Sequence, residues 1–342
     1  MSKILNQRVI IVLLILFALV FPLIFAENRY VLHVMTIGFI FTIAVYGMNL
    51  LAGFTGQLSL AHAGFFAIGA YSLGIITTRT EMNFWLALLS AVVITCAAGL
   101  VLGAIALRTK EHFFAIYTLI VGYLIYLLID KWGDLTGGVR GLIGIPMPDP
   151  IGPLTFETAT SMYYLVLFFM LISIFVAVRI VRSLTGRTYI AIRNSEDLAQ
   201  TLGINTRLNK LVSFVVSVAY AGLAGALYAA LTRFIGPDIA STHMVFNFLM
   251  FLIVGGIGTL SGPLVGTMLF VWLEQFLRSY QEYHLLIFGP ILVFMVIFFP
   301  TGIVGGFYKI KAKWVNAKKT KRVGRPEPVP AKSTKEQGEE LS

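Results

Sequence analysis

The sequence predicts an all-α membrane protein, a polytopic bundle of about eight to ten membrane segments. Of its 342 residues, 58% are hydrophobic and 12% are charged, whereas a soluble domain is usually about 45–50% apolar and about 25% charged. Runs such as 9–26 and 31–52 reach or approach the roughly 20 apolar residues that a membrane-spanning helix needs. Backbone groups in hydrocarbon must be paired within their own segment, and the runs lack the alternation of barrel strands, so helices are favoured.

Ten membrane segments are predicted in order along the chain. They cover residues 9–26, 31–52, 58–77, 84–107, 113–129, 162–178, 211–231, 245–254, 263–277 and 284–300. The first lacks a small-x-small cleavage pattern and is interpreted as an uncleaved helix rather than a signal peptide. The eighth and ninth are short, so one or both are expected to be re-entrant or broken helices, and eight crossings would then remain.

Basic residues predict the orientation and the domain organisation. Of the 26 Lys and Arg residues, 20 fall on one side if the N-terminus is cytoplasmic, so both termini are predicted to lie inside. A Gly- and Pro-rich loop, 130–161, is then external, and a loop of mixed charge, 179–210, is cytoplasmic. Residues 1–308 form the membrane domain, and 309–342 form a basic, disordered cytoplasmic tail. The net charge of +10 is thus attributed to topology and lipid head groups, not to nucleic acid.

The loop 179–210 contains a short helix with both ends marked. Ser195 is a suitable N-cap, acidic residues follow it, and Gly203 suits the C′ position. The predicted helix, 196–202, is shorter than the roughly 12–15 residues that are marginally stable alone in water. It therefore packs on its own bundle or docks on a partner protein, and Leu198 and Leu202 share one face at i, i+4 spacing.

This loop resembles the coupling loop of ABC importer permeases, in the variant of the LivM-type branched-chain amino acid permeases. The matching residues are Gly186, Arg187, Ala191, Ile192, Arg193, Glu196, Asp197, Ala199, Leu202, Gly203, Ile204 and Asn205. Further matches run from Gly47 to Phe65, around Leu135–Pro146 and from Gly255 to Pro263, so the resemblance covers roughly 46–305. A departure is Asn194-Ser195, where the family usually has acidic residues.

The resemblance implies that 1–308 is the permease domain of an ABC importer in the bacterial inner (plasma) membrane, passing leucine, isoleucine and valine. The sequence has no Gly-Lys dipeptide and hence no P-loop. The family implies two separate ABC ATPase subunits that use ATP and Mg²⁺, a second homologous permease of the LivH type, and a periplasmic or extracytoplasmic substrate-binding protein. This chain is then a transport subunit, not an enzyme, with no cofactor or metal. The residues predicted to couple it to the ATPase are Gly186, Arg187, Arg193, Ser195, Glu196, Asp197, Leu198, Ala199, Leu202 and Gly203.

A Gly-x-x-Gly-x-Leu-Ser pattern occurs at 53–59 and again at 255–261. Glycine interruptions of short membrane segments are typical of transport pathways, but both patterns also suit tight turns at helix ends. Candidate pathway residues are Gly53, Gly56, Gln57, Ser59, His62, Gly255, Gly258, Thr259 and Ser261. His62 is alternatively bonded to a neighbouring carbonyl.

Other readings stay open. Permeases resembling this family also serve urea, short-chain amides and other amino acids. An ion-coupled secondary transporter is less favoured, because Glu274 is almost the only ionisable residue in a membrane segment. The five histidines lack metal-ligand spacing, which disfavours a membrane enzyme. Asn49 and Asn247 are predicted to form hydrogen bonds between helices.

Overall fold

The computed structural model describes residues 13, 15–25, 27–80, 82–109, 111–276, 290 and 302–306. Its contacts divide the chain into two units, 1–305 and 306–342, and the first holds every element named below. The predicted tail and nearly all of the predicted tenth segment, 284–300, lie outside the described residues.

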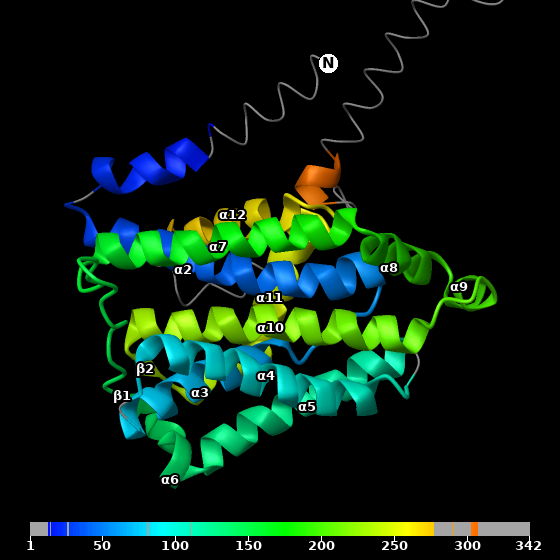
Figure 1. Ribbon diagram of the computed structural model, residues 1–342, viewed down its shortest axis with the longest axis horizontal. Helices are drawn as coiled ribbons and strands as arrows, with labels where there is room; N and C mark the ends of the chain where they lie inside the picture. Colours follow the sequence, from blue (N-terminus) through cyan, green and yellow to red (C-terminus); the bar gives the residue numbers. More distant parts are fainter. Residues whose placement is uncertain are drawn as a thin grey trace, which may run out of the picture. The chain divides into compact units, whose positions relative to one another are not determined.

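Long helices dominate the described part and run side by side (Figure 1). They are α2 Arg29–Met48, α3 His62–Arg79, α4 Phe84–Ala106, α5 Glu111–Lys131, α7 Ala159–Arg182 and α10 Thr206–Thr232. In this part of the chain, five helical stretches are long and apolar enough to cross a membrane, and Ile15–Ile24 and Thr242–Gly255 are shorter apolar helices. The predicted all-α, polytopic class is confirmed.

Several of these helices extend beyond the predicted apolar segments, and α10 and α7 extend the furthest. α10 begins five residues before the predicted 211, because the side chain of Asn205 caps it and accepts the N–H of Leu208 at 3.0 Å. α7 continues past the predicted 178 to Arg182. Apolar length therefore fixes the part of a helix that suits hydrocarbon, while capping residues fix where the helix itself starts.

The packing around α10 depends on glycine. α10 contacts α2, α3 and α4. A Cβ at Gly225 would overlap the carbonyl oxygen of Phe66, and one at Gly222 would lie 2.5 Å from the hydroxyl of Thr95. Small residues let helix backbones approach closely where lipid offers no hydrophobic force to join them.

The eighth predicted segment is a short helix that crosses the bundle instead of following it. α11, Thr242–Gly255, follows the 3₁₀ turn η3, Pro237–Ala240, and precedes α12, Gly262–Phe276. Its N-terminal end lies against α3 and α5, and its C-terminal end against α12. In Figure 1 it passes behind α2 and α10, across their direction. Its length of about 21 Å is less than the roughly 30 Å of a hydrocarbon core.

The expectation that the eighth segment is short is thus confirmed, while the ninth, α12, reaches the edge of the described residues and its length stays a prediction. The number of crossings, and the side on which each terminus lies, remain predictions.

The two long loops lie at opposite ends of the helices (Figure 1). Loop 179–210 contains α8, Leu184–Asn194, and α9, Glu196–Thr201. Loop 130–161 contains α6, Gly133–Thr136, and β1, Leu142–Ile143. β1 pairs antiparallel with β2, Phe234–Ile235, with Leu142 opposite Ile235. This arrangement agrees with the prediction that the two loops face opposite sides of a membrane.

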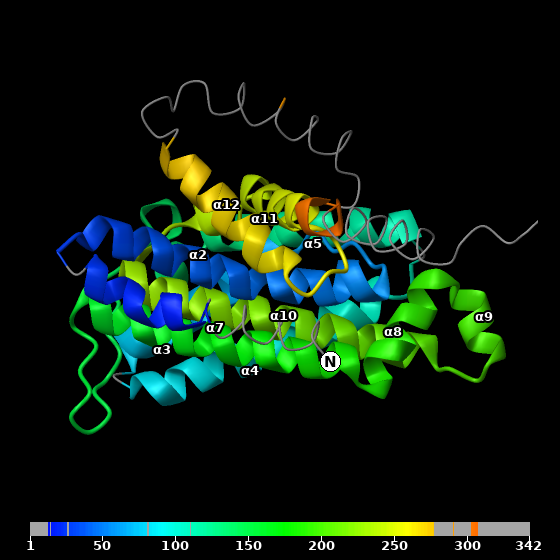
Figure 2. The same cartoon turned by 90° about the horizontal axis from the view of Figure 1, so that it is seen from above.

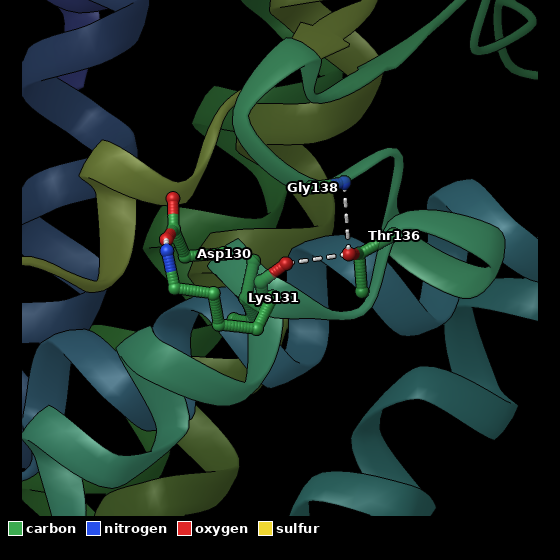
Figure 3. Close-up of polar contacts among 5 residues, drawn as sticks. Asp130, Lys131, Thr136 and Gly138 are labelled. Carbon is green, nitrogen blue, oxygen red and sulfur yellow. Dashed lines mark hydrogen bonds and ion pairs between the residues drawn. The ribbon is translucent and has the colours of Figure 1, made fainter.

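Loop 130–161 is tied down by its own polar groups. Thr136 Oγ1 donates to the carbonyl of Ile129 at 2.6 Å and accepts the N–H of Gly138 at 3.2 Å (Figure 3). The Nζ of Lys131 lies 2.9 Å from Oδ2 of Asp130. These contacts fix the start of the loop against the C-terminal end of α5.

Candidate functional site: the coupling helices and the glycine junction

Two serines start the helices of loop 179–210. The hydroxyl of Ser183 accepts the N–H of Gly186 at 3.4 Å, and that of Ser195 accepts the N–H of Leu198 at 3.3 Å. α9 ends where Gly203 adopts a φ of +81°, a conformation that favours glycine. The helix predicted at 196–202 is confirmed with its N-cap, and it ends one residue earlier.

One face of α9 is supported by its own chain. Glu196 forms an ion pair with Lys210 on α10. The side chain of Gln200 donates to the hydroxyl of Thr206 at 3.1 Å, and Ala199 is 2% exposed. These contacts explain how a helix of six residues persists, since isolated helices of this length are unstable in water.

The other face of α9 is uncovered and apolar. Leu198 is 60% exposed and Leu202 is 72% exposed. Asp197 is exposed beside them, and these three residues are called the coupling surface below. Burying a leucine side chain contributes about 1.5–3 kcal/mol, so this face is suited to a partner. Packing on its own bundle, one of the two roles open to the helix, thus accounts for only one of its faces.

The remaining candidate coupling residues do not share this surface. Gly186 is buried where α7 meets α8, and a Cβ there would overlap the carbonyl of Val181. Arg187 is exposed on α8. Arg193 is directed toward the bundle, where its Nη1 donates to the carbonyl of Gly53.

Arg193 occupies space left by three glycines. Its Cγ would lie 3.0 Å from a Cβ placed on Gly56, and its Nη1 would lie 2.6 Å from a Cβ on Gly258. A side chain on either glycine would displace it. The guanidinium therefore joins the last helix turn before α9 to both Gly-x-x-Gly-x-Leu-Ser segments.

Those two segments, 202 residues apart in sequence, contact each other. The side chain of Asn49 donates to the carbonyl of Thr259 at 2.8 Å and accepts the N–H of Gly258 at 2.8 Å. Tyr46 donates to the carbonyl of Leu260 at 2.6 Å. A Cβ on Gly53 would lie 2.7 Å from the nitrogen of Gly258. This contact, with Arg193 against it, is called the glycine junction.

The prediction of interhelical bonding is confirmed for Asn49 and wrong for Asn247. The side chain of Asn247 lies 3.3 Å from Nδ1 of His243, one turn away on the same helix. The difference follows from position, because Asn49 is buried between segments whereas Asn247 lies half-exposed on α11.

The junction rests on an element that the sequence did not predict. At Asn49, α2 continues as a π-helix, η1 Asn49–Thr55, and Gly56 ends it with a φ of +80°. The hydroxyl of Thr55 bonds the carbonyl of Leu50 at 3.1 Å and lies 2.7 Å from the hydroxyl of Ser213 on α10. Single-turn π segments occur frequently at functional sites. The glycine spacing was the one available signal of irregular backbone.

The other pathway candidates lie close to the junction. Gly255 packs on α12, where a Cβ would overlap the carbonyl of Gly262, and the hydroxyl of Thr259 accepts the N–H of Gly262 at 3.1 Å. Ser59 is buried, and Gln57 and Ser261 are half-buried. Because 53–56 is at the α8 end of the apolar span Arg29–Thr55, the first glycine segment lies near that end of the bundle.

His62 is fully buried and has a structural partner. Its Nε2 lies 2.8 Å from the hydroxyl of Ser217, and that hydroxyl lies 2.7 Å from the carbonyl of Gly47. With Ser217 donating to the carbonyl, Nε2 of the imidazole donates to Ser217. His62 thus links α3 to α10 through a hydroxyl.

Comparison with known protein families gives one matching model, described as the branched-chain amino acid transport system permease component, over residues 30–296. The chain is similar to the high-affinity branched-chain amino acid permease protein LivM of Escherichia coli K12, with 30% identity over 321 residues, covering 87% of this chain and 75% of LivM. It is 24% identical to LivH of the same organism over 291 residues, covering 79% of this chain and 92% of LivH. BraD of Pseudomonas aeruginosa is 25% identical over 303 residues, with 83% and 97% covered. No solved structure matches.

Proposed function

This chain belongs to the family of branched-chain amino acid transport permease components, and we propose that it is the membrane-spanning subunit of an ATP-driven importer for leucine, isoleucine and valine. The family match spans α2 to α12 and includes α8 and α9. The apolar helices suit an integral protein of the inner membrane.

A second permease chain is part of this proposal. The chain is similar both to LivM and to LivH, which are two permease proteins of one organism. Two homologous subunits then pair, and separate ATPase subunits and a binding protein complete the importer.

The uncovered apolar face of α9 is the observation that carries the proposal. Leu198 and Leu202 have 60% and 72% of their surface exposed, and α9 lies at one end of the bundle (Figure 1). A groove on an ATPase subunit would bury both, in the helix-in-groove mode of recognition. Asp197 beside them favours a basic residue at the rim of that groove.

Motion of the ATPase would reach the membrane part through Arg193. α9 is joined to α8 at Ser195, and the guanidinium of Arg193 holds Gly53 at the end of α8. Gly53 contacts the backbone at Gly258, which connects α11 and α12. A displacement of α9 would therefore move the glycine junction, a close contact between two irregular segments.

The test is the double variant Leu198→Asp with Leu202→Asp. Buried charge in an apolar groove is strongly unfavourable, so co-purification of the ATPase subunits and ATP-dependent leucine uptake in proteoliposomes should both be lost. Membrane insertion should be unchanged, since neither side chain is buried in the chain itself.

Leu154→Asp is the matched control for ATPase binding. Leu154 is 63% exposed but lies in loop 130–161, at the opposite end of the bundle. ATPase subunits should still co-purify with it. If the Leu198/Leu202 double variant retained ATPase binding and uptake, the docking role of α9 would be rejected.

A further inference from the structure

The outward face of α7 changes from apolar to basic near the C-terminal end of the helix. Its large exposed apolar side chains are Phe168, Ile172, Phe175 and Val176. Arg179 and Arg182 continue the same face at helical spacing, and both are exposed. Because α7 is long and apolar enough to cross a membrane, the two arginines mark the depth at which it passes from hydrocarbon into the head groups.

The guanidinium of Arg179 lies against an aromatic ring instead of a carboxylate. Its Cζ is 5.8 Å from the ring centroid of Phe175, and Phe175 is itself 62% exposed. Among the described residues, neither Arg179 nor Arg182 forms an ion pair or a hydrogen bond through its side chain. The charge of both arginines is therefore left for a group outside this part of the chain.

Several basic side chains elsewhere are bound within the chain. Arg79 donates to the carbonyl of Leu135 at 2.9 Å, and Lys210 forms an ion pair with Glu196. Arg179 and Arg182 are instead neighbours of like charge, three residues apart on one helix, and like charges at such spacing repel. An anion placed between them would offset that repulsion.

α8 begins directly after these arginines. Ser183 ends α7 and starts α8, and its hydroxyl donates to the carbonyl of Ile180 at 2.7 Å. Leu184, the first residue of α8, is 77% exposed. Figure 2 shows α8 at the end of α7, on the way to α9. Exposed leucine beside cationic side chains is typical of a segment in the membrane interface.

We propose that Arg179 and Arg182, with Leu184 and the ring of Phe175, bind the head group of an anionic phospholipid. A lipid phosphate accepts hydrogen bonds from planar guanidinium groups, often two at a time. The acyl chains would lie along the apolar face of α7, which is continuous with the two arginines.

Charge favours a lipid over an ATPase subunit as the occupant of this site. The coupling surface on α9 contains Asp197, so the groove that fits it has a basic rim. A basic rim would be repelled by Arg179 and Arg182. The inference goes beyond the proposed function, because it requires only that α7 spans a membrane.

The site would set the depth of α8 in the membrane interface. The turn between α7 and α8 is tight, since a Cβ on Gly186 would overlap the carbonyl of Val181. A lipid bound at the end of α7 therefore also restrains the start of the helix that carries Arg193.

The experiment measures lipid binding by the purified, complete transporter. Detergent-solubilised phosphatidylglycerol is titrated, and the bound lipid is counted by mass spectrometry of the intact complex. Phosphatidylcholine, which has no net charge, and inorganic phosphate are the comparison ligands. The test variant is Arg179→Gln with Arg182→Gln. The matched control, Arg140→Gln with Arg207→Gln, removes two exposed arginines that lie in loop 130–161 and on α10.

The test variant should bind phosphatidylglycerol about 25-fold more weakly, which is about fivefold for each arginine near a membrane surface. The control should change the affinity less than about twofold, because exposed charges beyond a screening length contribute little. Arg179→Lys with Arg182→Lys should give an intermediate affinity, since lysine keeps the charge but lacks the planar fork. ATPase subunits should co-purify with all of these variants.

Four results would overturn the inference. The first is equal affinity of the test and control variants for phosphatidylglycerol, and the second is equal affinity of the unmodified transporter for phosphatidylcholine and phosphatidylglycerol. The third is displacement of phosphatidylglycerol by an equal concentration of inorganic phosphate, which would indicate a phosphate site that does not recognise lipid. The fourth is loss of the ATPase subunits from the test variant with unchanged lipid affinity, which would assign the arginines to protein docking.

Discussion

Replacing Arg193 with methionine should uncouple ATP hydrolysis from transport without releasing the ATPase. Methionine keeps an unbranched apolar stem but is shorter than arginine and lacks the donor that binds the Gly53 carbonyl. The coupling surface on α9 is untouched, because Arg193 is directed toward the bundle while Leu198 and Leu202 face outward.

The magnitude follows from the bond that is lost. A hydrogen bond to a charged group contributes about 1.5–3 kcal/mol, and each 1.4 kcal/mol is roughly a factor of ten in an equilibrium. Arg193 is exposed to water, so the lower end applies. The equilibrium constant that favours the Arg193-stabilised arrangement of the glycine junction should thus fall about tenfold.

Leucine uptake into proteoliposomes, with ATP and the binding protein supplied, should fall by about that factor. ATPase subunits should co-purify as with the unmodified chain, while the stimulation of ATP hydrolysis by the loaded binding protein should fall. Arg193→Lys should give an intermediate rate, because lysine keeps the charge without the planar fork. Arg207→Met is the control, since Arg207 is exposed on the first turn of α10.

Two results would refute this reasoning. Unchanged uptake by Arg193→Met would show that the bond to Gly53 does not transmit motion. Loss of ATPase co-purification would show that Arg193 contacts the partner directly, as a residue of the docking surface.

Two further changes test the packing and the cap. Gly225→Ala should lower the melting temperature in detergent by several degrees, because its Cβ would overlap the Phe66 carbonyl and overpacking costs about 1–3 kcal/mol. Gly133→Ala is the control and should leave the melting temperature unchanged, since no atom lies within 4 Å of its Cβ. Equal melting temperatures for the two variants would contradict the close packing of α3 and α10. Ser195→Ala removes the N-cap of α9, which costs the helix about 1 kcal/mol of stability, and should weaken the affinity for the ATPase about fivefold. Ser195→Asp keeps a capping side chain and should retain the affinity. Equal affinities for the Ala and Asp variants would mean that the cap does not stabilise the docked helix.

The parts of the fold that were predictable depend on local chemistry. Apolar runs located the long helices, since lipid demands a continuous apolar span. Ser195 and Gly203 predicted the two ends of α9, because an N-cap and a left-handed residue affect only the adjoining turn of a helix. Asn49 was correctly assigned to interhelical bonding because a buried amide in a membrane protein needs a partner.

The unpredicted parts depend on tertiary contacts. The transverse course of α11 is fixed by Phe248 against Phe41 and Phe66, three rings from three segments. A run of apolar residues has the same composition whether its helix follows the bundle or crosses it. Likewise the direction of Arg193 depends on the space at Gly56 and Gly258, which are distant in sequence from it and from each other.

The repeated glycine pattern shows why a sequence motif and a transport route need not coincide. Its glycines are required by backbone contact: side chains at Gly53 and Gly258 would each meet the opposite segment, and one at Gly56 would meet Arg193. A surface that must admit a zwitterion needs the reverse, exposed polar side chains with nothing packed on them. Backbone contact alone therefore accounts for the glycines of both segments, so the recurrence of the pattern is not in itself evidence that these segments line a transport route.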